Sequence, residues 1–179
     1  MKHFIILAFS ILLYSCNHSS TQSKPSTDKK YQTYTNKGKG FSLNYPAKWD
    51  TTQKVPNVIF CAIEKSKDET DRFNEGINVS VYPSEGKTMQ QIIDDNIRIA
   101  NQIYKTPVIS QHNAKNVNGV VYSTLELKIK NQGLTLISNS SFFSNGTTIY
   151  TVTQIAEESG IGSYRPIMNN VINSFTFLK

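Results

Sequence analysis

Cysteine is scarce in this sequence, with only Cys16 and Cys61 among its 179 residues. Beyond the N-terminal region Cys61 stands alone, so the rest of the chain cannot close an internal disulfide and must rely on a hydrophobic core. About 140 residues are enough for one such core. We expect Cys61, inside the apolar run 58–63, to be a small core residue. The alternative, a nucleophile, has no activating neighbour visible in the sequence.

Catalytic patterns are also missing. After His18 the sequence has one histidine, His112, so a metal site would need carboxylate or thiol partners. We expect His112 to be a polar loop residue, the alternative being a ligand shared with loop carboxylates. No serine lies in a Gly-x-Ser-x-Gly turn, and no glycine-rich phosphate loop follows an expected strand. The sequence therefore predicts no cofactor and no enzymatic activity.

Long hydrophobic runs are absent. The apolar run 4–14 is shorter than the roughly 20 residues that a membrane-spanning helix needs. Lys2 and His3 precede it, and Leu13-Tyr14-Ser15-Cys16 follows, an arrangement that resembles a bacterial lipoprotein signal. The resemblance implies that residues 1–15 are removed and that Cys16 is acylated. The alternative is a plain secretory signal with an incidental cysteine.

Residues 16–36 contain almost nothing apolar and are expected to form a flexible tether. Asn17 follows the candidate lipid site. In Gram-negative sorting an aspartate at this position retains a lipoprotein in the inner membrane, so the resemblance implies the outer membrane here. The tether also lacks the acidic cluster that resembles a surface-export signal. We therefore expect an outer-membrane protein, lipid-anchored and facing the periplasm.

The net charge of +6 belongs mainly to this N-terminal part. Residues 16–40 carry five lysines against Asp28, which leaves about +1 from Phe41 onward. A domain so close to neutral lacks the basic face that nucleic-acid binding requires. We expect no nucleic-acid partner, and only a weak attraction of the lysines to anionic lipid.

The folded part opens with Phe41, Leu43 and Tyr45 alternating with polar residues, which is the period of a half-buried strand. Pro46 ends this strand, and Trp49 follows where a large ring can fold back over the core. By alternation or apolar content, further strands are predicted at 31–35, 58–63, 77–82, 108–111, 121–130, 134–144 and 147–156. Turns are expected at 118–119 and 145–146.

Two helices are predicted, at 89–104 and 163–174. Thr88 and Gln91 form a capping-box pattern at the start of the first. Its expected buried face consists of Met89, Ile92, Ile93, Asn96, Ile97, Ala100, Ile103 and Tyr104. Asp94 and Arg98 have the spacing of a favourable ion pair on the other face. The second helix presents Tyr164, Ile167, Met168, Val171 and Ile172 as its apolar face.

Three short segments resemble the PsbP-like family, which includes the extrinsic PsbP protein of photosystem II and DcrB-type bacterial lipoproteins. They are the strand and Tyr-Pro-x-x-Trp of 41–49, the segment 73–79, and Ser174-Phe175 near the end. The resemblance covers nearly all of residues 38–179. It implies one α+β domain at 37–179, in which helices sandwich an antiparallel sheet. Such hydrophobic motifs specify the fold better than the function.

Two functions remain open. The first is a non-enzymatic envelope protein whose PsbP-like domain binds another envelope component. The second is a periplasmic module for a small ligand or divalent metal, with its site between the sheet and the loop 65–76. Its candidate residues are Tyr45, Trp49, Asp68, Glu69, Asp71 and Glu75. The acidic spacing does not match an EF-hand, so a solvated loop is the alternative reading of that cluster.

Overall fold

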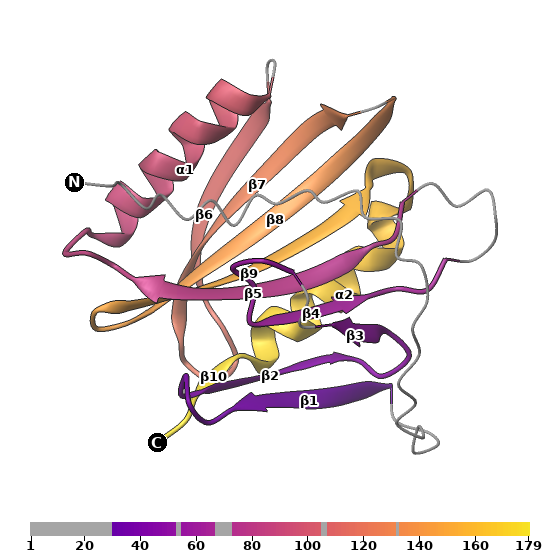
Figure 1. Cartoon of the computed structure of the whole chain (residues 1–179). Helices are drawn as coiled ribbons and strands as arrows, with labels where there is room; N and C mark the ends of the chain where they lie inside the picture. Colours follow the sequence, from indigo (N-terminus) through magenta and orange to yellow (C-terminus); the bar gives the residue numbers. More distant parts are fainter. Residues whose placement is uncertain (1–29, 53–54, 67–72, 105–106, 132) are drawn as a thin grey trace.

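The computed structural model describes residues 30–52, 55–66, 73–104, 107–131 and 133–179 (Figure 1). In chain order its elements are β1 (Tyr31–Asn36), β2 (Phe41–Pro46), β3 (Asp50–Thr52), β4 (Phe60–Ile63), β5 (Gly76–Pro83), α1 (Met89–Ile103), β6 (Val108–Lys115), β7 (Val121–Asn131), β8 (Leu134–Asn145), β9 (Thr148–Glu157), the 3₁₀ turn η1 (Glu158–Gly160), α2 (Ile161–Ser174) and β10 (Thr176–Phe177). The predicted α+β class is confirmed.

The strands form two antiparallel sheets. Seven strands make the larger sheet, in the order β3-β4-β5-β9-β8-β7-β6, and β1, β2 and β10 make the smaller one. The continuous apolar run 58–63 predicts a centrally buried strand, but β4 covers only Phe60–Ile63 and is the second strand from the edge of the sheet, next to the three-residue β3. β1 falls within the segment 16–36 expected as a tether, as the separate strand prediction at 31–35 indicated.

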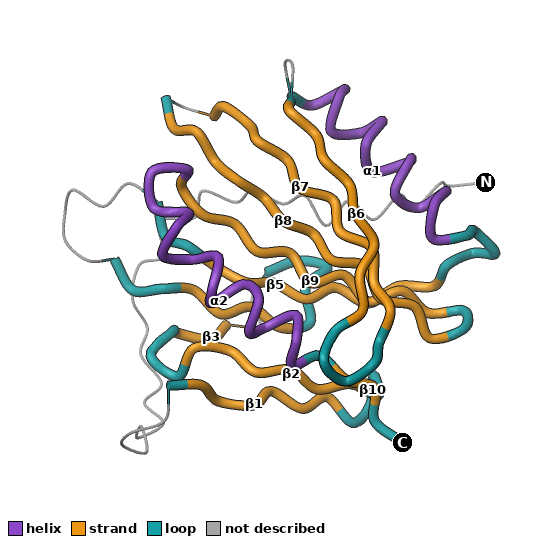
Figure 2. Tube along the Cα trace, turned by 180° about the vertical axis from the view of Figure 1, so that it is seen from behind, coloured by secondary structure: helices purple, strands orange, loops and turns teal. Residues whose placement is uncertain are grey.

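The two helices cover opposite faces of the larger sheet (Figure 2). Successive side chains along a strand point to opposite faces of the sheet. Phe143 and Tyr150 therefore belong to the core beneath α2, whereas Phe142 and Ile149 belong to the core beneath α1. The α2 core also takes in the smaller sheet through Phe41. The molecule therefore has one apolar core on each face of the larger sheet.

The β8–β9 hairpin confirms the predicted turn but shifts it by one residue. Asn145 pairs with Thr148, so the two loop residues are Gly146 and Thr147 rather than Asn145 and Gly146. Gly146 has a φ of 65°, a left-handed conformation that glycine adopts without steric cost. The predicted turn at 118–119 is also present, with Gly119 at φ 79°.

The capping box of α1 is present, since Thr88 accepts from the backbone of Gln91 and the Gln91 side chain accepts from the backbone of Thr88. Two expectations for this helix are wrong. Ile103 is 52% exposed at the last position of α1, while Ile99 is buried. Arg98 pairs with Asp95 at 2.8 Å, not with Asp94.

Arg98 pairs with Asp95 rather than Asp94, and a second cation from outside the helix also contacts the Asp95 carboxylate. Lys87, just before the cap, lies 2.7 Å from the same carboxylate. Hydrogen bonds from Lys87 and Arg98 lower the pKa of Asp95. Asp94 accepts instead from the side chain of Gln90, at 2.8 Å. Helical spacing alone could not reveal this arrangement.

Candidate functional site

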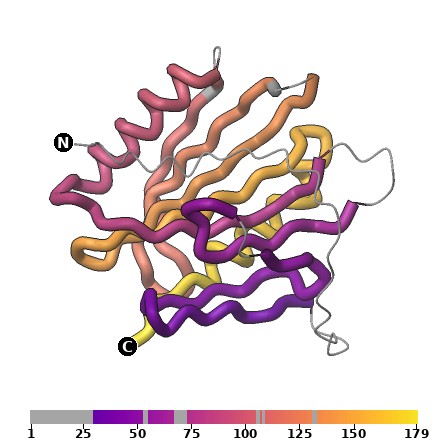
Figure 3. The backbone as a smooth tube through the Cα atoms, in the orientation of Figure 1, coloured from indigo at the N-terminus to yellow at the C-terminus, as the bar shows by residue number. Residues whose placement is uncertain are grey.

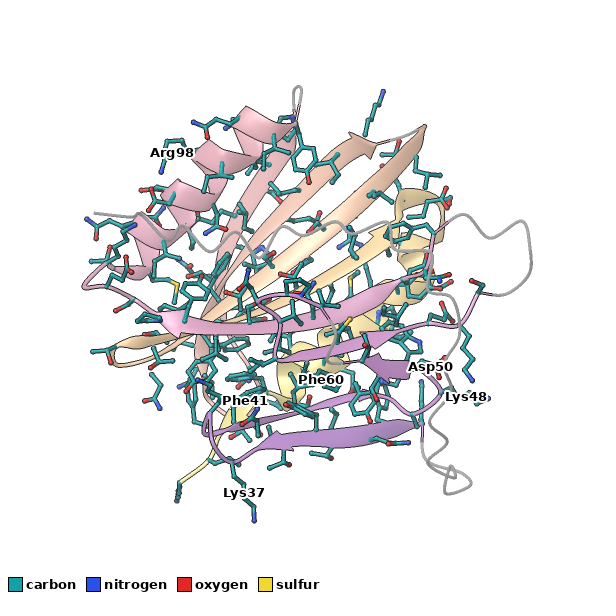
Figure 4. All side chains as sticks on the ribbon, in the orientation of Figure 1. Lys37, Phe41, Lys48, Asp50, Phe60 and Arg98 are labelled. Atoms are coloured by element: carbon teal, nitrogen blue, oxygen red, sulfur yellow. The ribbon has the colours of Figure 1, made fainter. Side chains whose placement is uncertain are left out.

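An open groove of about 460 Å³ lies at one end of the β1–β2 hairpin. It is lined by Lys30, Pro46, Lys48, Trp49, Glu64 and Lys65. These residues come from the start of β1, the end of β2, the following turn and the end of β4, so the groove joins the smaller sheet to the larger one. Figure 4 places Lys48 and Asp50 at this end of the molecule and Lys37 at the opposite end of the hairpin.

Trp49 forms the apolar floor of the groove. Pro46 ends β2, and the backbone N–H of Trp49 then donates to the carbonyl of Pro46 at 3.1 Å, which closes a tight turn. The turn directs the indole back onto the α2 core, where it is 9% exposed. The structure thus places Trp49 against the core, as the sequence predicts.

Tyr45 does not line the groove. Its ring packs edge to face on Phe60 at 5.0 Å, and its hydroxyl donates to Gln32 at 3.1 Å. Burial raises the pKa of Tyr45. Tyr45 and Trp49 thus belong to the same core, but of the two only Trp49 lines the groove.

Of the four acidic candidates, Asp68, Glu69 and Asp71 lie outside the described residues. Glu75 is 6% exposed and lies just before β5. The hydroxyl of Tyr164 donates to Glu64 and also contacts Glu75. Burial raises the pKa of Glu75, against opposing hydrogen bonds from backbone groups of Glu75 and Glu157.

This arrangement is a pair of carboxylates that share one tyrosine. Burial, followed by the hydrogen bond to Glu64, raises the pKa of Tyr164 above its ordinary value. In the part of the chain that the structure describes, no group of three or more histidine, cysteine, aspartate or glutamate residues could hold a metal ion. Glu64 is the member of the pair that also reaches the groove.

The sequence reasoning missed the three lysines of the groove. Lys65 lies 3.5 Å from Asp50, and both side chains are about two-thirds exposed. Lys30 and Lys48 are exposed, and no ion pair joins either of them to another described residue. The three are far apart in the sequence, and the pairings of β1 with β2 and of β3 with β4 bring them together. No short-range pattern signals such a cluster.

The remaining candidates lie elsewhere. Cys61 is buried on β4, at 7% exposure, as expected for a core residue. His112 was expected in a loop but lies exposed on β6, at the edge of the larger sheet. Neither described helix is long and apolar enough to cross a membrane.

Comparison with known proteins supports the resemblance seen in the sequence. The sequence model of the PsbP family matches residues 29–177. No curated protein matches significantly. The solution structure of cyanobacterial PsbP from Synechocystis is 19% identical, with a TM-score of 0.62, covering 92% of this chain and 98% of that one.

Two further structures share the fold. LpqN of Mycobacterium tuberculosis, a protein involved in cell envelope biogenesis, is 9% identical with a TM-score of 0.63, over 86% of this chain and 88% of its own. A protein of unknown function from Pseudomonas aeruginosa is 13% identical with a TM-score of 0.53, over 82% of this chain and 96% of its own. At these identities the likeness extends to the fold alone.

Proposed function

The chain belongs to the PsbP family, and from that premise we propose that it is a non-enzymatic accessory protein of the bacterial cell envelope. Lipid on Cys16 holds it to the membrane, and its PsbP domain binds another envelope component. One observation carries the proposal: the family match at 29–177 directly follows a lipoprotein-type signal and a polar segment. The envelope role of the structurally similar LpqN supports it.

The proposed arrangement has three parts. Residues 1–15 are a signal peptide. The segment 16–36 is a lipidated tether up to the start of β1 at Tyr31, where the domain begins. Asn17 favours the outer membrane, with the domain on the periplasmic side. The engagement of Glu75 with Tyr164 supports the non-enzymatic part of the proposal, because this carboxylate is buried and bonded within the domain rather than presented to a substrate.

Lipidation is tested in a Gram-negative host that expresses the full chain. We expect the wild type to incorporate radiolabelled palmitate and to fractionate with the outer membrane. Cys16→Ser should lose the label and move to the soluble fraction. Cys61→Ala is the matched control, since it removes the other, buried cysteine and should keep both label and membrane location. Label retained in the Cys16→Ser variant would rule out the anchor.

The accessory role is tested by mild crosslinking in the native envelope, affinity capture of the lipidated protein and mass spectrometry. A single envelope protein recovered in stoichiometric amount is the expected result. A robust hydrolase or transferase activity of the purified protein, abolished by one polar substitution, would contradict the non-enzymatic assignment.

A further inference from the structure

We propose that the groove around Trp49 binds the phosphate-bearing headgroups of the anionic lipid surface beside which the chain is anchored. This proposal rests on the proposed function, because the lipid anchor at Cys16 is what keeps the domain beside a membrane surface. It goes beyond that function in assigning a second membrane contact, made by the folded domain itself. Three features of the groove support it: its place in the chain, its charge and its floor.

The groove lies where the domain meets its N-terminal segment. Lys30, one of its lining residues, is the first described residue and stands 14 positions after Cys16. The tether expected from the sequence would, at that length, have a root-mean-square span of roughly 20 Å. An anchor at Cys16 would therefore hold this end of the molecule near the lipid surface. Such a short linker gives an effective concentration in the millimolar range, so weak contacts suffice.

Among the described residues, three lysines and one acid line the groove, so its lining carries a net positive charge. Lys30 and Lys48 have no ion-pair partner among the described residues, and the Lys65–Asp50 pair is so exposed that it contributes little and can separate. The acid that lines the groove, Glu64, accepts a hydrogen bond from Tyr164 on its inner side. Lysine ammonium groups bind phosphate as point charges. The same lysines argue against a divalent cation at this place.

The floor of the groove suits the part of a lipid just below its phosphate. Trp49 and Pro46 are mostly buried and supply a small apolar surface beside the lysines, and the volume of about 460 Å³ is within the range of small-molecule sites. Tryptophan is favoured where one side of a site is apolar and the other is wet. A soluble phosphate compound could make the same contacts with the lysines. The lipid anchor, however, would hold the groove close to membrane phosphates and not to a soluble compound.

The test uses the mature-length chain, residues 16–179, carrying Cys16→Ser so that no acyl chain contributes. Sedimentation with vesicles of phosphatidylglycerol and phosphatidylcholine is compared with sedimentation with phosphatidylcholine alone. We expect binding to the anionic vesicles with a change in Trp49 fluorescence. Binding should weaken in high salt, because screening shortens the electrostatic range.

Charge reversal identifies the surface involved. Each lysine near an anionic bilayer contributes about a fivefold increase in partitioning, so K48E/K65E should weaken binding at least about 25-fold. The control K37E/K39E makes the same change in net charge on two exposed lysines in the turn at the other end of the hairpin. It should weaken binding no more than a few-fold. All four side chains are exposed, so folding should be unaffected.

Three results would overturn the proposal. The first is equal binding to anionic and neutral vesicles, and the second is equal loss in the two double variants. The third is glycerol phosphate at millimolar concentration saturating the Trp49 signal and displacing the protein from vesicles, which would indicate a soluble ligand. None of these bears on acylation of Cys16, which the palmitate experiment measures separately.

Discussion

Glu75 is a carboxylate that the fold buries beside a second carboxylate. Its exposure is 6%, and its contacts are the hydroxyl of Tyr164, the neighbouring Glu64 and two backbone groups. Desolvation disfavours the charged form, so the pKa of Glu75 rises above its ordinary value of 4.5. Proton binding at this residue therefore favours the folded state.

The pH dependence of stability should reflect this residue. The contribution of Glu75 is fully present below the pKa of the unfolded chain and is lost as pH rises through the higher pKa of the folded state. Glu75→Gln keeps an acceptor for the backbone but carries no charge. We expect it to raise the free energy of unfolding at pH 7 and to flatten the profile above pH 4.5.

Urea unfolding of the wild type and Glu75→Gln between pH 4 and pH 8 measures the effect. Glu85→Gln is the control, because Glu85 is exposed and its replacement removes the same charge. Parallel pH profiles for wild type and Glu75→Gln would show that the buried carboxylate carries no such penalty.

Phe175 stands at the centre of the aromatic residues in the α2 core. Its ring stacks on Phe143 at 3.9 Å between centroids and on Phe41 at 5.7 Å, and it meets Tyr150 and Phe177 edge to face. The side chain is fully buried. It thus joins rings from β2, β8, β9 and β10.

Phe175→Ala should lower the free energy of unfolding by about 3–5 kcal/mol, because it removes buried apolar surface and leaves a cavity among rigid rings. Phe175→Leu fills most of that volume and should cost clearly less. Denaturant melts followed by circular dichroism compare the two. A similar loss for both would point to a backbone role for this position instead of packing.

At the scale of elements, Asn116 ties the β6–β7 turn to the end of α2. Its side-chain N–H₂ donates to the carbonyls of Ile172 and Phe175, and its side-chain oxygen accepts from the backbone of Asn118 and Val120. The residue is 5% exposed. Carbonyls at a helix end have no partner within the helix, so this side chain satisfies them from another element.

Asn116→Ala should destabilise the fold by about 2–4 kcal/mol, since it leaves several buried polar groups unpaired. Asn116→Asp keeps the acceptor but loses the donor, and it should also be destabilised. Asn118→Ala is the comparison: Asn118 donates to Asn173 and Phe175 but is itself exposed, so its loss should cost less. Equal stability of the Asn116 and Asn118 alanine variants would contradict this account.

The elements that the sequence predicted correctly are those whose pattern repeats. β7 alternates apolar and polar residues along most of its 11 residues, turn signals bound β8 and β9, and α1 carries both a cap and an apolar face. β3 and β10 were not predicted. β3 has three polar residues and β10 has only two residues, and both are too short to show a period. They are strands only through their partners β4 and β2.

The candidate site was predictable in part for the same reason. Pro46 and Trp49 mark a strand end and a core ring within four residues, so local chemistry places them. The lysine rim and the contact of Tyr164 with Glu64 and Glu75 depend on strand pairing and on the docking of α2. Residue types could not indicate these contacts without the sheet order, which no local pattern encodes.

At the scale of the whole molecule, exposed lysines gather at both ends of the β1–β2 hairpin. Lys30, Lys48 and Lys65 gather at the end where the N-terminal segment enters, while Lys37 and Lys39 occupy the turn at the other end of the same hairpin. A domain that is nearly neutral overall therefore still presents exposed lysines in separate clusters at the two ends of this hairpin. The net charge of the sequence could not show this.

The smaller sheet brings the two ends of the domain together, as Figure 3 shows for its indigo and yellow segments. β2 lies between β1 and β10, Thr176 and Phe177 pair with Ser42 and Phe41, and the N–H of Leu178 reaches the carbonyl of Gly40 at 2.9 Å. Removing residues 175–179 should therefore prevent stable folding, seen as lost protease resistance.

That placement has a consequence for the order in which the domain can form. In any process that releases the chain from its N-terminus, such as synthesis, β10 and Phe175 emerge after β1 to α2. Until they emerge, β2 lacks its second partner and the α2 core lacks its central ring. The fold should therefore be completed only after β10 has emerged.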